Sequence, residues 1–286
     1  MTSEWKQIII EFRKNKLAVV GFYIAVGLLL LSVLAPFLAP HDPLEPNLTA
    51  KLIPGFWAGN WNNFLGTDNL GRDLFSRILY GGTISLRVGY IVILITAVFG
   101  TILGVVPAYY GKAVDMFLMR IVDVFLAFPP LLLALAIAAA LGTGLEKAML
   151  AISLTYIPGM ARIVRSSVLT VKTLPYVEAS QSMGASSTWI IVRHILPNIL
   201  APAVVYLTLL LADAILYTAA LGFLGVGIDP STPEWGAMLS SGRDYLLMGQ
   251  WWVTVFPGIM IVLAVLSFNL FGDGLRESLD SKLRVQ

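Results

Sequence analysis

The chain has 286 residues, of which 57% are hydrophobic and 13% are charged, and its mean hydropathy is +0.81. Soluble domains carry about 25% charged residues, so this composition predicts an integral membrane protein. The length leaves room for one membrane domain, but not for many spans plus a large soluble domain. The absence of cysteine excludes a disulfide framework and cysteine-ligated metal, whereas the net charge of +2 excludes nothing by itself.

Six apolar segments are bounded by charged residues, Pro or Gly and are long enough to cross a bilayer, which takes roughly 20 residues per helix. In chain order they are Leu17–Leu38, Val88–Tyr109, Phe117–Leu141, Ala148–Val168, Ala201–Leu221 and Trp252–Leu270. The first is longer than the core of a signal peptide and lacks a small-x-small cleavage site after it, so we expect it to remain as a span. The pattern predicts an all-α membrane protein with six transmembrane helices.

The distribution of Lys and Arg predicts the orientation, because these residues are enriched in cytoplasmic connections. If both termini lie on one side of the membrane, that side receives 13 of the 19 Lys and Arg residues, and the opposite side receives 6. We therefore expect both termini and the polar connection at residues 172–199 to face the cytoplasm.

The longest connection, Ala39–Tyr80, then lies outside. Its first part, up to Gly55, is rich in Pro and Asn and is typical of irregular chain. In its last part, Leu65–Tyr80, apolar residues recur at near-helical intervals, at Leu70, Leu74, Ile78 and Leu79. This spacing, with Asp and Arg on the other face, predicts an amphipathic helix at the membrane surface, and an ordinary solvated loop is the alternative.

Ionisable residues within spans are expensive in hydrocarbon and tend to face a cavity or a partner. Asp213 is the deepest of them, and it either lines a translocation path or hydrogen-bonds a neighbouring helix. Arg120 and Asp123 flank the start of the third span, where an interface pair or a snorkelling arginine explains them equally well.

Glycine and proline predict where helices approach each other, bend or end. Gly100 and Gly104 have the Gly-x-x-x-Gly spacing that lets two backbones approach closely. The run Phe128–Pro130 should break the hydrogen-bond ladder of the third span and kink it. The three glycines within Ala220–Gly227 predict that the fifth span stops or unwinds there.

The polar connection contains Tyr176–Gly184 and His194–Asn198, which a membrane face has no obvious reason to keep unless a partner docks there. Pro175 and Pro197 bracket a stretch that can form two short helices, with a sharp turn at Gly184 between them. Small side chains leave a surface that a partner's groove can cover closely: Ala179, Ser180, Ala185, Ser186 and Ser187. Glu178 lies near a helix start, where its charge complements the helix dipole or an arginine of the partner.

The sequence carries no signature of catalysis. Gly142–Lys147 has the wrong spacing for a phosphate-binding loop and lies in an outside connection. His41 and His194 fall on opposite sides of the membrane in this topology and cannot share a metal ion. No intramembrane Ser/His or paired-Asp arrangement is evident, so we expect neither an enzyme nor a metal site.

The polar connection resembles the EAA loop of permeases of ATP-binding-cassette (ABC) importers, through Glu178-Ala179-Ser180, Gly184 six positions after the Glu, and Leu196-Pro197. Further motifs extend the resemblance over nearly the whole chain: Leu65–Asp68, Gly71–Asp73, Phe75–Arg77, Met119–Asp123, Leu221–Gly225, Pro233–Gly236 and Asn269–Arg276. Together they resemble the dipeptide/oligopeptide/nickel permease subfamily, specifically its second, "C-type" subunit.

Three positions depart from the family pattern. Ser180 replaces the last Ala of the EAA triplet, a change between small residues that should keep the packing of the loop. His194 stands where the general pattern has Ile, which the peptide subfamily tolerates. Thr218 stands where many members carry Glu, and this leaves the substrate branch open between dipeptides and other cargo, although the dipeptide members are the most similar.

The resemblance implies a type I ABC importer permease in the bacterial inner membrane, with an N-terminal region (1–80) and a core permease domain (81–286) that contains the coupling loop 172–199. The implied ATPase-coupling residues are Glu178, Ala179, Ser180, Gly184, Ala185, Ser186, Leu196 and Pro197. Asp213, Phe128 and Pro129 become candidates for the translocation path.

The implied partners are a homologous permease subunit, two ABC ATPases, an extracytoplasmic substrate-binding protein and membrane lipid, but no nucleic acid. This chain itself needs no cofactor, because ATP and Mg²⁺ would bind to the ATPases. Alternating access would move short peptides inward, and the same architecture could import nickel chelates or glutathione-like peptides. A channel or secondary transporter independent of an ATPase, and a membrane scaffold that recruits a cytoplasmic protein, are the rival interpretations.

Overall fold

The computed structural model describes residues 9–283, and within them all regular structure is helical, apart from one isolated bridge between Thr67 and Asp73. The helices and short turns, in chain order, are α2 (Lys16–Val33), α3 (Ala35–Leu38), η1 (Leu48–Ala50), η2 (Phe56–Ala58), α4 (Leu74–Tyr110), α5 (Lys112–Leu126), α6 (Pro130–Leu141), α7 (Leu145–Lys172), α8 (Pro175–Ser182), α9 (Ser187–Ile190), η3 (Ile191–Ile195), α10 (Leu196–Phe223), α11 (Trp235–Leu246) and α12 (Trp252–Leu283).

Four helices in the described part of the chain are long and apolar enough to cross a membrane: Lys16–Val33, Leu74–Tyr110, Ser187–Phe223 and Trp252–Leu279. The helices α5 and α6 meet at a bend of 93°. Together they add a fifth span if they form one broken membrane helix. The remaining predicted span forms α7, which is long enough but less apolar than these. Residues 9–283 therefore form a helical membrane domain with four spans, or five if the bent pair is one span.

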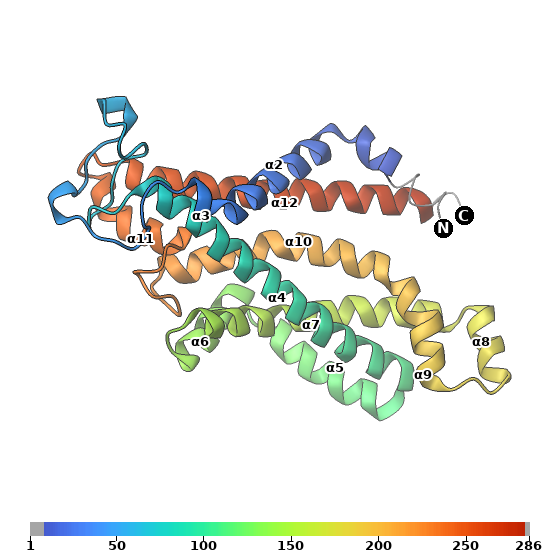
Figure 1. Ribbon diagram of the computed structural model, residues 1–286. Helices are drawn as coiled ribbons and strands as arrows, with labels where there is room; N and C mark the ends of the chain where they lie inside the picture. The colour runs from blue at the N-terminus through green and yellow to red at the C-terminus, as the bar shows by residue number, and fades with distance from the viewer. Residues whose placement is uncertain (1–8, 284–286) are drawn as a thin grey trace.

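The long helices form a bundle in which α2 packs along α12, α10 contacts α12, and α4 packs along α7 (Figure 1). The stretch between α3 and α4 gathers at one end of the bundle with α11 and the beginning of α12 (Figure 1). We call this the α11 end. The beginning of α2, the end of α12, α8 and α9 lie toward the other end (Figure 1).

The close packing of α4 with α7 depends on the predicted glycine pair. A Cβ on Gly100 would press into the side chain of Met160, and one on Gly104 would meet the backbone of Ala161. The two helices therefore approach as the Gly-x-x-x-Gly spacing predicts, and small residues at the interface allow close van der Waals packing of the two backbones. The predicted kink at Phe128–Pro130 is also confirmed, because it separates α5 from α6. Likewise α10 ends at Phe223, within the predicted glycine-rich stretch.

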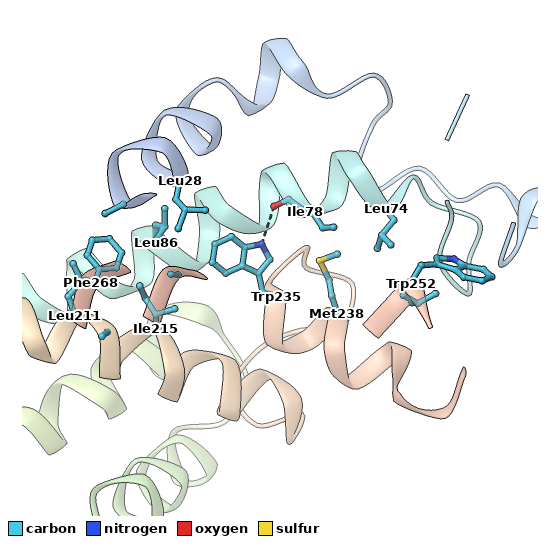
Figure 2. Packing of buried hydrophobic residues seen from close by; sticks show 14 residues of the cluster. Leu28, Leu74, Ile78, Leu86, Leu211, Ile215, Trp235, Met238, Trp252 and Phe268 are labelled. Carbon is cyan, nitrogen blue, oxygen red and sulfur yellow. Dashed lines mark hydrogen bonds between the residues drawn. The ribbon is translucent and has the colours of Figure 1, made fainter. Parts of the chain in front are cut away.

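An apolar cluster joins α4, α10, α11 and α12 around Trp235 (Figure 2). The Trp235 indole N–H donates to the carbonyl oxygen of Ile78 at 3.0 Å, so its buried polar atom is satisfied. Gly81 allows this close approach, since a Cβ there would lie 2.7 Å from the indole ring. At the start of α11 the buried Glu234 carboxylate accepts from the amide of Ala237 at 2.8 Å and from the hydroxyl of Ser85 at 3.1 Å.

The separate amphipathic helix predicted for Leu65–Tyr80 is wrong. Residues 65–73 contain no helix, and α4 begins only at Leu74, where the side chain of Asp73 accepts from the amide of Ser76 at 2.8 Å. Gly66 and Gly71 have φ angles of +82° and +76°, which interrupt any helix before that cap.

The charges that had suggested a polar helix face are instead buried and paired. Arg72 Nε lies 2.7 Å and Arg77 Nε lies 3.4 Å from Asp68 Oδ2, and all three side chains are almost inaccessible to solvent. Arg77 also donates to the carbonyl oxygen of Pro43 at 2.8 Å, which fastens the preceding irregular segment to α4. The spacing alone could not distinguish a water-facing charge from one that binds its own loop.

Candidate functional site

Residues 173–198, which we call the elbow, connect α7 to α10 and contain all the predicted coupling residues. After α7 ends at Lys172, Pro175 occupies the first turn of α8, where its missing N–H leaves no helical hydrogen bond unmade. The first of the two predicted short helices is thereby confirmed. The second is not separate, because α9 continues through η3 into α10 as one helical rod, Ser187–Phe223.

The continuity of this rod has a local cause. Pro197 was expected to mark the end of the short helix, yet it lies in the first turn of α10. The preceding segment, Ile191–Ile195, is a π-helix with a wider turn than an α-helix. A wider turn relieves the clash between a proline ring and the carbonyl of the residue four positions before it, so the chain passes Pro197 without breaking.

The sharp turn predicted at Gly184 is confirmed. Its φ angle is +82°, a left-handed conformation that costs glycine little. The turn closes the end of α8, because the amides of Met183 and Ala185 donate to the carbonyls of Ala179 and Ser180 at 3.0 and 3.1 Å. A Cβ on Gly184 would meet no heavy atom within 4 Å, so the tip of the elbow is open.

The predicted coupling residues do not share one environment. Five are exposed, namely Glu178, Ala179, Gly184, Ser186 and Pro197. Ala185 and Leu196 are partly buried, and Ser180 is buried. The exposed residues form a small-side-chain surface with one carboxylate, whereas Ser180 points into the elbow and cannot touch a partner directly.

Ser180 and His194 form a contact that the sequence did not reveal. The Ser180 hydroxyl donates to the carbonyl oxygen of Tyr176 at 2.8 Å and lies 3.1 Å from His194 Nε2. Because the hydroxyl proton is used by Tyr176, the Nε2–H of His194 is the donor in the second bond. The two residues that depart from the family pattern, Ser180 and His194, thus connect α8 to η3. No spacing rule could have paired residues fourteen positions apart across a turn.

Two aromatic rings pack against the imidazole of His194. The rings of Tyr176 and Trp189 lie 5.4 and 4.9 Å from the imidazole of His194, measured between centroids. The side-chain amide of Asn198 donates to the carbonyl oxygen of His194 at 2.6 Å and to the hydroxyl of Tyr176 at 3.1 Å. Hydrogen bonds and ring contacts therefore hold the elbow in one conformation.

An apolar base joins the elbow to the long helices. Val177, Ile190 and Ile195 from the elbow are buried in one cluster with side chains of α4, α7 and α10. At its edge, Lys172 donates to the carbonyl oxygen of Tyr109 at 2.6 Å and lies 5.4 Å from the centre of the Tyr109 ring. A force on the elbow surface would act on three long helices at once, because close-packed interiors transmit displacement.

Ion pairs connect the same half of α7 to α5. Arg165 binds Asp115 with two hydrogen bonds of 2.6 Å, and Arg162 pairs with Asp123. Asp123 therefore has a partner on another helix, which supports the interface interpretation, whereas Arg120 is exposed.

The candidate path residues fall in two places. Asp213 is exposed on α10, and Phe128 and Pro129 are exposed at the bend between α5 and α6, which pack mainly against α7. The structure does not bring these two places together.

Three tyrosines that the sequence analysis missed lie near Asp213. Tyr156, Tyr206 and Tyr217 lie near enough to interact with its charge, and the rings of Tyr156 and Tyr217 are 5.5 Å apart. The positions 206, 213 and 217 share one helical face at spacings of seven and four, a signal that was present in the sequence.

Within residues 9–283, no three His, Cys, Asp or Glu side chains come together. His41 follows α3 and His194 lies in η3, and the two elements lie apart in the bundle (Figure 1).

Two family models match the chain. Residues 97–285 match the binding-protein-dependent transport system inner membrane component, and residues 3–54 match the N-terminal transmembrane domain of oligopeptide transport permease C. The first match covers the last part of α4, the elbow and α10.

Curated relatives match almost end to end. A dipeptide transport system permease protein of Alkalihalophilus pseudofirmus is 44% identical over 99% of this chain and 91% of its own length. Its counterpart in Haemophilus influenzae is 44% identical over 96% of this chain and 93% of its own length. A glutathione transport system permease protein of Pectobacterium atrosepticum is 40% identical over 98% and 92%.

Solved structures support the fold. An inward-facing conformation of the MetNI methionine ABC transporter matches with a TM-score of 0.56 and 23% identity, over 71% of this chain and 96% of that one. An amino acid ABC transporter with histidines matches with a TM-score of 0.52 and 13% identity, over 71% and 94%. The family match, the relatives and the apolar helices together show that this chain is a multi-pass protein of the bacterial inner membrane and belongs to the family of binding-protein-dependent transport system inner membrane components.

Proposed function

We propose that this chain is one of two permease subunits of an ATP-driven importer of dipeptides and other short peptides. The observation that carries the proposal is the elbow, a rigid unit with an open small-side-chain surface, in a chain 44% identical over nearly its whole length to dipeptide permeases. A glutathione permease at 40% identity supports a second candidate cargo, a glutathione-like peptide.

The proposed topology has six transmembrane helices with both termini in the cytoplasm. The spans are α2, α4, the bent pair α5–α6, α7, α10 and α12. Two observations support it: the beginning of α2 and the end of α12 lie toward the end of the bundle that carries the elbow, and Lys and Arg are concentrated in the connections assigned to that side.

The proposed partners are a homologous permease subunit, two ATPases that dock on the elbow, and a binding protein that delivers the peptide at the α11 end. ATP and Mg²⁺ would bind to the ATPases. When these subunits close on ATP, the elbow moves with them, and its apolar base passes the movement to α4, α7 and α10. Glu178 on the exposed first turn of α8 offers a carboxylate to an arginine of the ATPase.

The proposed path runs along the face of α10 that carries Asp213. A carboxylate with tyrosine side chains near it can bind the amino group and the amides of a short peptide. Tyr156 supports a ligand role, because its buried hydroxyl has no hydrogen-bond partner among residues 9–283. Phe128 and Pro129 would move with the α5–α6 bend rather than contact the same ligand.

Reconstitution of the chain with its partner subunits in proteoliposomes tests this function. The expected result is uptake of a labelled dipeptide that requires both ATP and the binding protein. Dipeptide uptake by the purified chain alone would contradict it and favour an independent channel. ATPase docking with no transport of dipeptides, glutathione or nickel chelates would favour the scaffold interpretation.

A further inference from the structure

An uncharged aromatic loop lies at the α11 end of the bundle. No Asp, Glu, Lys, Arg or His occurs between Lys51 and Asp68, and the stretch contains Phe56, Trp57, Trp61 and Phe64. We call residues 55–64 the aromatic loop. A connection of this length that lay wholly in water would carry charge, so the composition already indicates a different surrounding.

The loop is held in shape by its own hydrogen bonds. The amide of Phe56 donates to the carbonyl oxygen of Phe64 at 3.0 Å. The Asn60 side chain donates to the carbonyl oxygen of Pro54 at 3.2 Å and accepts from the amide of Asn63 at 3.2 Å. Pairing of these polar groups within the loop lowers the cost of placing it where water is scarce.

This backbone presents three large rings together on its surface. The rings of Phe56 and Phe64 stack with centroids 4.8 Å apart, and the ring of Trp61 lies 6.4 and 6.2 Å from them. Trp61 is 72% exposed, and the two phenylalanines are 41% and 40% exposed. Contiguous exposed apolar groups of this kind mark a contact with a partner or a membrane.

The other side of the loop fixes its position relative to the spans. Trp57 packs against Trp251, Trp252 and Phe256, with ring centroids 4.9, 5.6 and 5.9 Å apart. The apolar span of α12 begins at Trp252, so these rings lie at the start of that span. Trp252 also donates to the carbonyl oxygen of Thr67 at 3.2 Å, which holds the end of the stretch at the same level.

The shape of the molecule directs the loop sideways. Figure 1 shows the stretch between α3 and α4 with one loop projecting to the side of the bundle, next to the beginning of α12. Leu247 and Met248, in the turn just before Trp251, are 93% and 68% exposed and extend the apolar rim. A soluble protein that docks on the end of the bundle would approach along its axis, whereas lipid surrounds its side.

We propose that the aromatic loop is an interfacial anchor, which inserts Phe56, Trp61 and Phe64 into the headgroup layer of the leaflet at the α11 end. Aromatic side chains concentrate at this depth, because their rings leave water while indole N–H groups still find polar partners. The anchor holds the long segment before α4 against the membrane, independently of which solute the transporter carries.

The absence of cysteine from the chain allows a direct test. Trp61→Cys is labelled with an environment-sensitive fluorophore in the assembled transporter, reconstituted in phosphatidylcholine and phosphatidylglycerol vesicles. Glu45→Cys, exposed in the same segment, is the aqueous control, and Val262→Cys, 63% exposed on the span of α12, is the lipid control. Asn62→Cys labels the loop while leaving its three rings intact.

The expected result at Trp61 and Asn62 is emission at shorter wavelength than at Glu45, with a several-fold loss of quenching by aqueous iodide. Lipids that carry a nitroxide on the headgroup should quench these two labels more than lipids labelled deep in the acyl chain, the reverse of Val262. Iodide quenching equal to that at Glu45 would overturn the proposal. Protection from iodide and from both lipid quenchers, whether constant or induced by the binding protein, would also overturn it, because the loop would then be covered by protein.

Discussion

The two ends of the bundle use polar residues in opposite ways. At the α11 end, Arg72 and Arg77 are buried and both pair with the buried Asp68. At the elbow, Glu178 and most small polar side chains are exposed, and the contacts that shape the turn come from backbone groups and one histidine. Charged motifs at the first end therefore stabilise the fold, whereas those at the second remain available to a partner.

Breaking the buried ion pairs should give the largest effect on stability. Asp68→Asn keeps the shape of the side chain but leaves the guanidinium groups of Arg72 and Arg77 without their counter-ion. Removal of one partner of a buried pair costs about 3–5 kcal/mol, so we expect loss of most folded protein, measured by thermal unfolding in detergent.

The matched control is the exposed pair Arg243–Asp244, with 3.3 Å between Nε and Oδ1. Asp244→Asn should change the free energy of unfolding by less than about 1 kcal/mol. Equal unfolding temperatures for the two variants would show that the α11 end does not depend on its buried charges.

At the elbow, the largest expected effect is on docking rather than folding. Gly184→Asp puts a side chain on a left-handed residue, which costs about 1–2 kcal/mol, and adds a charge to the open tip. We expect a stable membrane protein that no longer co-purifies with the ATPase.

Gly249 provides the control, because its φ angle is +90° and a Cβ there would also meet no atom within 4 Å. Gly249→Asp, between α11 and α12, should lose comparable stability and retain the ATPase. Retention of the ATPase by both variants would contradict the proposed docking surface.

The buried carboxyl of Glu234 should make stability depend on pH. Burial raises the pKa of this carboxyl above its ordinary value of 4.5, against the opposing hydrogen bonds from Gly236, Ala237 and Ser85. The folded state therefore holds the proton more tightly than the unfolded state, so this group's contribution is greatest below pH 4.5 and is lost as the pH rises through the raised pKa. Glu234→Gln should flatten this dependence of the unfolding temperature on pH. An unchanged pH profile would contradict the assignment.

Ser180→Ala should have the smallest effect. It restores the family pattern, but it removes the acceptor for His194 Nε2 and the donor to Tyr176, and a hydrogen bond of this kind contributes about 0.5–1.5 kcal/mol. We expect a slightly lower unfolding temperature with the ATPase still bound. Loss of the ATPase without loss of stability would mean that Ser180 contacts the partner, although it is buried.

The sequence predicted those features that depend on local chemistry. The apolar runs predicted the long helices, Gly184 predicted the turn, and Phe128–Pro130 predicted the bend of the third span. It failed where distant residues decide the local structure. The left-handed Gly66 and Gly71, and the burial of Arg77 against Pro43, turn an apparent amphipathic helix into a folded loop.

In the elbow, the sequence also could not reveal the π-helical segment. The π-helical turn lets the rod continue past Pro197, and Ile190, Ile195 and Ile199 are buried in one cluster on both sides of that turn. The histidine contact with Ser180 depends on the same packing. Those interactions make the elbow rigid, which a docking surface that transmits force requires.

Photo-cross-linking from the two ends tests the central claim most directly. A photoreactive amino acid replaces Met183, 81% exposed beside the elbow tip, or Met248, 68% exposed before α12, in the assembled transporter. The account predicts an ATPase adduct from position 183 and none from position 248. An adduct from position 248, or none from position 183 in a complex that retains its ATPase, would contradict the assignment of the elbow as the coupling site.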